Sequence, residues 1–142
     1  MHKRLWGAAC AATIALLFAP GALAEGNLAS QPETIELNID SRSLAFSQTE
    51  YVLETGKYYR WVINHDGYEE LMVRAPDLFR NSWISQIVIG DMEVHTSGAI
   101  YGLEFDDEGT QVIYFLPVRP GNYDFFVPGF EERGLSGVFV VR

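Results

Sequence analysis

Short apolar segments separated by glycine and proline turns run through the chain from Thr34 onward. In the first of them Ile35, Leu37 and Ile39 alternate with polar residues, which is the pattern of a strand buried on one face. Many short strands at this spacing predict an all-β fold over residues 34–142, an antiparallel sandwich or barrel. Further strands are expected at residues 51–53, 58–63, 71–73, 84–89, 93–95, 100–105, 111–116, 123–127 and 137–141.

The connections between these segments also carry information. Composition predicts a tight turn over Asn64–Gly67. Residues 75–83 are expected to form one helical turn or an irregular loop, because Pro76 suits the start of a helix. The acidic stretch 106–108 lacks the length and spacing of a calcium-binding loop and is interpreted as a turn.

A leader precedes the β segments. The chain starts with a short basic stretch, continues with an apolar run over residues 5–19, and then carries Ala22-Leu23-Ala24, an A-x-A cleavage box. The alternative is a transmembrane anchor, but the run is short for a bilayer span and lacks a stop-transfer flank. We therefore predict a signal peptide over residues 1–24, a flexible segment over 25–33, and a periplasmic or secreted protein with no membrane span after cleavage.

Removal of the leader changes the charge and the redox chemistry of the chain. Lys3 and Arg4 leave with it but no acidic residue does, so eight basic residues face nineteen acidic ones and the formal net charge is −11. Nucleic acid is excluded as a partner, because phosphate contacts need clustered Lys and Arg. The only cysteine, Cys10, also leaves, so the remaining chain can form no disulfide and offers no thiolate to a metal.

Two segments resemble the cupredoxin family. Residues 119–141, RPGNYDFFVPGFEERGLSGVFVV, are similar to the closing hairpin of cupredoxins, which reads P-G-x-Y-x-[FY]-x-C, then a loop with His and Met, then G-x-[LVI]-x-V. Residues 55–64, TGKYYRWVIN, look like the cupredoxin strand that ends in Asn. The resemblance implies a cupredoxin-like antiparallel β-sandwich with Greek-key connections.

The positions that bind copper in that family differ here. Val127 stands where the resemblance places the Cys, Phe130 where it places the loop His, and Leu135 where it places the axial Met. Glu69 or Glu70 stands where the first His would fall. A blue-copper centre needs a thiolate ligand, so none is expected, and the apolar substitutes predict that the copper pocket has become packed core.

Two polar groups are candidates for a different metal site. His65, Glu69 and Glu70 follow one strand closely, and imidazole with carboxylates suits an iron, zinc or copper(II) ion. This stretch is similar to cupredoxin-like proteins of bacterial ferrous-iron uptake, which carry a Glu-Glu pair here and a Phe-Phe in the final hairpin. Glu93 and His95 share one face if their segment is a strand. We hypothesise that both histidines meet with Glu69 or Glu70 around an iron or copper ion. The alternative is an exposed acidic turn and a surface strand end.

A third candidate is Glu131-Glu132-Arg133, in the loop where the resemblance implies that partners dock. The alternative is a solvated loop. No catalytic motif is recognisable, so we do not expect an enzyme. The first hypothesis for function is an accessory protein without a blue-copper centre that binds a periplasmic or membrane partner protein, or a ligand. The second is a metal-handling protein that binds iron or copper through His and carboxylate ligands.

Overall fold

The computed structural model describes residues 31–96 and 99–142, so the expected signal peptide and most of the segment 25–33 lie outside the described residues. The first described strand begins at Glu33. The elements, in chain order, are β1 (Glu33–Asp40), β2 (Ala45–Phe46), β3 (Glu50–Leu53), β4 (Tyr59–His65), β5 (Leu71–Val73), α1 (Pro76–Arg80), β6 (Ser82–Ile89), β7 (Met92–Val94), β8 (Leu103–Phe105), β9 (Gly109–Pro117), β10 (Gly121–Phe126), the 3-10 helix η1 (Glu131–Arg133) and β11 (Ser136–Val141).

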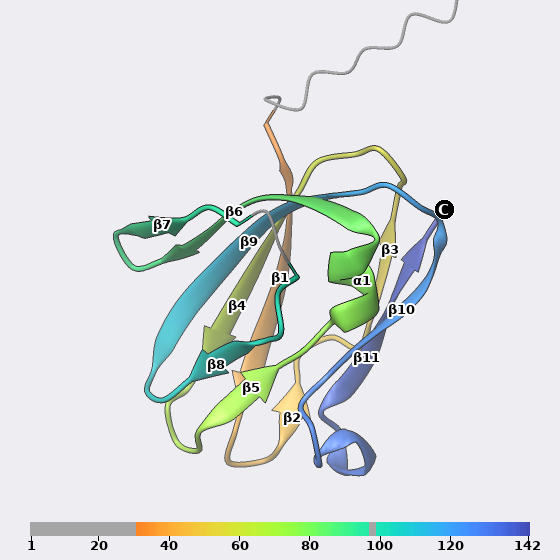
Figure 1. Ribbon diagram of the computed structural model, residues 1–142. Coiled ribbons are helices and arrows are strands. Elements are labelled where there is room, and N and C mark those ends of the chain that lie inside the picture. The colour runs from red at the N-terminus through yellow and green to blue at the C-terminus, as the bar shows by residue number, and fades with distance from the viewer. Residues whose placement is uncertain (1–30, 97–98) are drawn as a thin grey trace, which may run out of the picture.

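The strands form the two layers of a sandwich (Figure 1). The larger sheet has the order β2-β1-β4-β9-β6-β7, the opposite sheet has the order β10-β11-β3, and β5 pairs with β8 in a small third sheet. The all-β sandwich is therefore confirmed. Two strand pairs, β1–β4 and β3–β11, run parallel rather than antiparallel. β2 and β3 lie between β1 and β4 in the chain, and this long connection lets β1 and β4 run in the same direction.

Alternating burial confirms the expected strand faces. Tyr59, Trp61 and Ile63 of β4 are buried, whereas the residues between them are half-exposed. β4 is longer than the sequence suggested, because Asn64 and His65 still pair with β1 and β9. The turn expected at Asn64–Gly67 therefore begins only after His65.

Aromatic rings from both layers meet in the middle of the sandwich. The ring of Trp61 on β4 lies edge-on to that of Phe139 on β11, with centroids 4.9 Å apart, and edge-on to Phe125 on β10 at 5.7 Å. Phe125 and Phe139 are themselves 4.9 Å apart. Such contacts stabilise beyond the burial of apolar area and link the sheets at one place.

The short helix α1 confirms the single helical turn expected around Pro76. The proline occupies its first turn, and Leu78 and Phe79 are buried. In Figure 1 the helix stands beside the sandwich, between β6 and β10. Within the part of the chain that the structure describes, no helix is long and apolar enough to cross a lipid bilayer.

Candidate functional site at one end of the sandwich

The closing loop between β10 and β11 is held by its own backbone and by apolar side chains. The N–H of Val127 donates to the carbonyl of Leu135 (3.0 Å), and that of Leu135 donates to the carbonyl of Phe130 (3.2 Å). The N–H of Phe130 donates back to the carbonyl of Val127 (3.0 Å). The side chain of Val127 is 2% exposed and that of Leu135 is fully buried, while Phe130 packs partly against the core.

These side chains do not fit a blue-copper ion. An isopropyl, a phenyl and an isobutyl group offer no lone pair to a metal, and they are packed against other apolar groups. Val127 and Leu135 are core residues, as expected, whereas Phe130 is only partly buried and lines a pocket. The fourth position, Glu69 or Glu70, lies on the neighbouring loop with its side chain exposed.

His65, the first candidate ligand, is buried at the end of β4. Its Nδ1 atom lies 3.1 Å from the N–H of Gly67, which donates to it, and 3.3 Å from the carbonyl oxygen of Asp107. Its ring stacks on that of Phe105 with centroids 5.2 Å apart. Its Nε2 atom has no hydrogen bond in the structure. His65 therefore contacts both the β4–β5 loop, through Gly67, and the β8–β9 turn, through Asp107.

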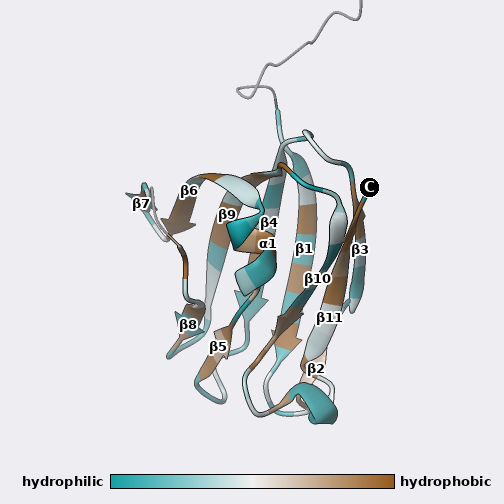
Figure 2. Ribbon diagram, turned by 45° about the vertical axis from the view of Figure 1, so that its right-hand side comes forward, coloured by the Kyte–Doolittle hydropathy of each residue, from teal (hydrophilic) through white to brown (hydrophobic). Residues whose placement is uncertain are grey.

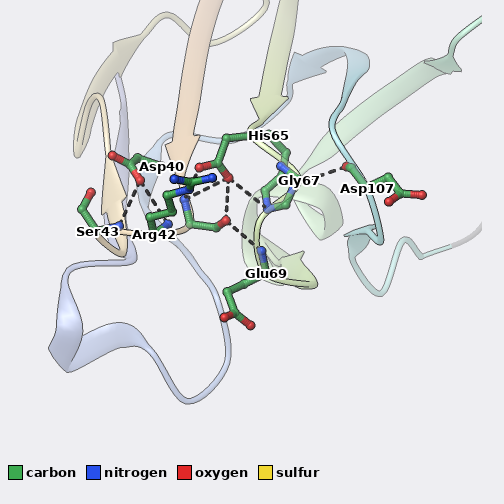
Figure 3. Close-up of polar contacts among 9 residues, drawn as sticks. Asp40, Arg42, Ser43, His65, Gly67, Glu69 and Asp107 are labelled. Atoms are coloured by element: carbon green, nitrogen blue, oxygen red, sulfur yellow. Dashed lines mark hydrogen bonds and ion pairs between the residues drawn. The ribbon is translucent and has the colours of Figure 1, made fainter.

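A small hydrogen-bond network fixes the loop after β4 to the turn after β1 (Figure 3). The hydroxyl of Ser41 donates to Oδ1 of Asp66 (2.5 Å), and the N–H of Ser41 donates to the same carboxylate. The N–H of Glu69 donates in turn to the hydroxyl oxygen of Ser41 (2.9 Å). The hydroxyl bond from Ser41, followed by backbone N–H bonds and the neighbouring His65, lowers the pKa of Asp66 below its usual value, although partial burial opposes the shift.

The turn after β1 has a second carboxylate of this kind. Oδ1 of Asp40 accepts the N–H of Arg42 (3.0 Å) and the N–H of Ser43 (2.9 Å), the arrangement of an Asx turn. The hydrogen bonds from Ser43, then that from Arg42, lower the pKa of Asp40. Both loops at this end therefore depend on ionised aspartates.

Glu70 lies beside two acidic residues that are not among the ligands expected from the sequence. Carboxylate oxygens of Glu70, Glu104 and Asp106 all lie within 4.8 Å of one another, and all three side chains are exposed. The pairing of β5 with β8 sets Leu71 opposite Phe105 and so brings the flanking carboxylates together. Alternation along 103–106 would have placed Glu104 and Asp106 on one face, but nothing in the sequence identified β5 as the partner strand.

The other candidate pair lies elsewhere. Glu93 is on the edge strand β7 and His95 follows it, both exposed, with Nε2 of His95 3.7 Å from Oε2 of Glu93. Nδ1 of His95 lies 3.4 Å from the carbonyl oxygen of Ser85. Among residues 31–96 and 99–142, the carboxylates around Glu70 form the one group of three or more potential ligands this close together, and it includes neither histidine. The structure thus does not bring His65, Glu69, Glu70, Glu93 and His95 together into one site.

A pocket of about 300 Å³ opens between the closing loop and the loops after β1 and β4. The guanidinium of Arg42 lies 4.4 Å from the ring centre of Tyr68, and that of Arg133 lies 5.4 Å from the ring centre of Phe130. Glu131, Glu132 and Arg133 form the exposed helix η1, and in Figure 2 this helix between β10 and β11 is strongly hydrophilic. The pocket is lined by Ser41, Arg42, Leu44, Tyr68, Glu69, Glu70, Leu71, Phe130 and Arg133.

No protein-family model matches the chain, and no curated protein matches it. Solved structures do. Auracyanin A, a blue copper protein from the green thermophilic photosynthetic bacterium Chloroflexus aurantiacus, is similar with a TM-score of 0.52 and 18% identity, over 79% of this chain and 100% of its own. A copper-containing nitrite reductase from Thermus scotoductus SA-01 is similar with a TM-score of 0.57 and 11% identity, over 81% of this chain and 32% of its own.

A laccase from Pediococcus acidilactici gives a TM-score of 0.60 at 7% identity, over 80% of this chain and 27% of its own. The chain thus spans about a third or less of these two larger enzymes. At such identities the likeness is one of fold. The domain has the cupredoxin-like β-sandwich fold.

Proposed function

We propose that this is an accessory protein of the periplasm or the cell exterior that uses a cupredoxin-like fold without a blue-copper centre. It acts by binding a partner protein or a ligand at the end of the sandwich where the closing loop meets the loops after β1 and β4. The compartment is inferred from the expected signal peptide. The binding role is inferred from the end of the sandwich at the closing loop, where apolar residues stand at the copper-ligand positions of the family beside an open pocket with charged groups.

The observation that carries the proposal is the contrast around the closing loop. Val127 and Leu135 are packed into the core at positions where the family resemblance places copper ligands. Next to them, Arg133 and the two glutamates before it remain exposed on η1, and a pocket opens beside them. A surface that keeps an open pocket and charged groups after its metal ligands are replaced is suited to recognition rather than to electron transfer.

A copper titration tests the first half of the proposal. The purified mature protein, given copper(II), is expected to show no intense blue absorption, since no thiolate can ligate the metal. An intense blue charge-transfer band would contradict the proposal at once.

A loop variant tests the second half. Replacing Glu131, Glu132 and Arg133 together by alanine should abolish co-purification of any partner that wild-type protein captures from its own cell envelope, with folding checked by circular dichroism. The matched control replaces three exposed charged residues at other places, Asp77, Arg80 and Asp91. Equal capture by both variants would contradict a role for the closing loop.

One observation favours the second function, metal handling. The grouped carboxylates of Glu70, Glu104 and Asp106 are a donor set of oxygen atoms only, which suits a hard cation better than copper. Titration with iron(II) and manganese(II), followed by calorimetry, should give binding that Glu104→Gln weakens by about tenfold or more. Binding that is absent in the parent, or equal in that variant, would rule this function out.

A further inference from the structure

The pocket beside the closing loop is lined by four charged side chains that form no ion pairs with one another. Arg42 and Arg133 supply positive charge and Glu69 and Glu70 negative charge, all on its lining. Among residues 31–96 and 99–142, no ion pair joins any of these four side chains to another residue. A pocket whose own opposite charges do not neutralise each other can accept a ligand that carries both signs.

Each guanidinium group lies near the face of an aromatic ring. That of Arg42 is 4.4 Å from the ring centre of Tyr68 and that of Arg133 is 5.4 Å from the ring centre of Phe130, and neither side chain donates a hydrogen bond to the described part of the protein. A cation–π contact occupies none of the N–H donors of a guanidinium, so these donors stay available to a ligand. Those donors are arranged to bind a carboxylate in bidentate fashion.

The carboxylate side of the pocket is anchored through the backbone. The N–H of Glu69 is bound to the Ser41 hydroxyl, which is itself held by Asp66. This places the first glutamate at a fixed point of the rim, while its own carboxylate makes no hydrogen bond in the described structure. A free carboxylate at such a point is a natural acceptor for a protonated amine.

The rest of the lining is apolar. Leu44, Leu71 and Phe130 contribute to the pocket, and Leu71 is fully within the core. Leu44 has a φ angle of 54°, an unusual left-handed conformation for a leucine. Backbone strain of this kind is retained where the surrounding structure requires it, often at binding sites. A volume of about 300 Å³ is at the small end for a small-molecule site.

We propose that this pocket binds a free α-amino acid with an apolar side chain. The amino acid's carboxylate pairs with Arg133 and Arg42, its ammonium pairs with Glu69 and Glu70, and its side chain lies against Leu44, Leu71 and Phe130. This rests on the proposed binding function and specifies its ligand. The ligand's carboxylate and ammonium groups thus form the ion pairs that the pocket's charged side chains do not form with one another.

Calorimetry at neutral pH with leucine, N-acetyl-leucine and leucinamide tests the assignment. Leucine should bind. N-acetyl-leucine lacks the ammonium and leucinamide lacks the carboxylate, so each should bind about tenfold more weakly or worse, because each loses the hydrogen bonds of one charged group. Equal affinity for all three, or no binding of leucine at millimolar concentration, would overturn the proposal.

Two variants locate the charges. Arg133→Gln should weaken leucine by about tenfold yet leave leucinamide unchanged, because that probe has no carboxylate to lose. Glu69→Gln should weaken leucine similarly yet leave N-acetyl-leucine unchanged. The matched controls Arg119→Gln and Glu50→Gln remove exposed charges outside the pocket and should bind leucine like the parent. A uniform loss with every probe would show that the variants act on folding and would overturn the assigned roles.

The outcomes also separate this inference from the function on which it rests. If leucine does not bind while the closing-loop variant still loses its partner, only the amino-acid assignment fails. If the copper titration gives a blue band, the proposed function itself fails.

Discussion

The closing loop and the loop after β4 form two sides of one pocket, but different forces hold them. Residues 127–135 are closed by backbone hydrogen bonds and by buried Val127 and Leu135. Residues 66–69 are held by side-chain hydrogen bonds that end on the carboxylate of Asp66. The first loop depends on excluding water, and the second depends on an ionised group that water can reach.

The two loops also differ in the side chains at the positions where the family resemblance places copper ligands. In the closing loop Val127 and Leu135 point into the sandwich and belong to its apolar core. In the loop after β4 the corresponding residue is an exposed glutamate, and the loop is held by polar contacts. Stability should therefore fall strongly when a charge is buried in the closing loop, the apolar side of the pocket, and should depend little on pH there. On the polar side, the loop after β4, stability should depend on pH and on the hydrogen bonds to Asp66.

The largest effect is expected from Val127→Asp, which attacks the apolar side directly. The residue is 2% exposed among hydrocarbon groups, so a carboxylate there has no partner. We expect a loss of about 4 kcal/mol or more in the free energy of unfolding, measured by urea denaturation. Val127→Ala, the matched control, should lose only about 2 kcal/mol. Equal losses would mean that the slot admits water and that the comparison between the loops does not hold.

A smaller effect is expected from Gly137→Ala, which tests how tightly the same side is packed. A methyl group at this position would press on the ring of Phe125 and on the carbonyl oxygen of Thr49. Overpacking of a core costs about 1–3 kcal/mol. In Gly109→Ala the new methyl would lie 4.0 Å from the carbonyl oxygen of Asp107, an ordinary van der Waals distance, so unfolding should be nearly unchanged. A Gly137→Ala protein as stable as the parent would show that the ring can move aside.

The apolar side was also the more predictable one. Alternation along β4 and β10 and the apolar residues at 127 and 135 were enough to place the core and the sandwich. Local periodicity indicates which face of a strand is buried, and the main role of these residues is to fill the core. The parallel pairing of β1 with β4 was not predictable, because strand partners depend on contacts between distant segments.

The polar side was much less predictable for the same reason. Glu70 was expected from the sequence, but its neighbours are Glu104 on β8 and Asp106 just after β8, more than thirty residues further along the chain. The hypothesis that His65 and His95 meet assumed convergence, whereas β7 lies at the far edge of the larger sheet and His65 is buried at the end of β4. Short-range composition identifies residues able to bind, but the fold decides which of them are neighbours.

Ser41→Ala tests the polar side and should have a moderate effect. It removes the hydroxyl that donates to Asp66 and leaves the N–H of Glu69 without its acceptor. We expect a loss of about 1–2 kcal/mol in the free energy of unfolding, together with faster amide exchange at Glu69. Ser85→Ala removes a hydroxyl that makes no hydrogen bond in the described structure and is the matched control. Equal behaviour of the two variants would show that the network contributes nothing to this loop.

The smallest effect is expected from acid, and it should come from the polar side. Hydrogen bonds from Ser41 lower the pKa of Asp66, and those from Ser43 lower the pKa of Asp40. A carboxyl group whose pKa is lower in the folded state stabilises the fold above its unfolded value of about 3.9, and that contribution disappears as the pH falls through the folded value. The free energy of unfolding should therefore fall modestly from about pH 5 to about pH 3, because both groups are solvated.

Asp66→Asn should show a shallower fall over this range, whereas Asp124→Asn, which removes an exposed carboxylate on β10, should keep the slope of the parent. A slope unchanged by Asp66→Asn would show that its hydrogen bonds do not couple protonation to folding, and the distinction between the two loops would then rest on the apolar side alone.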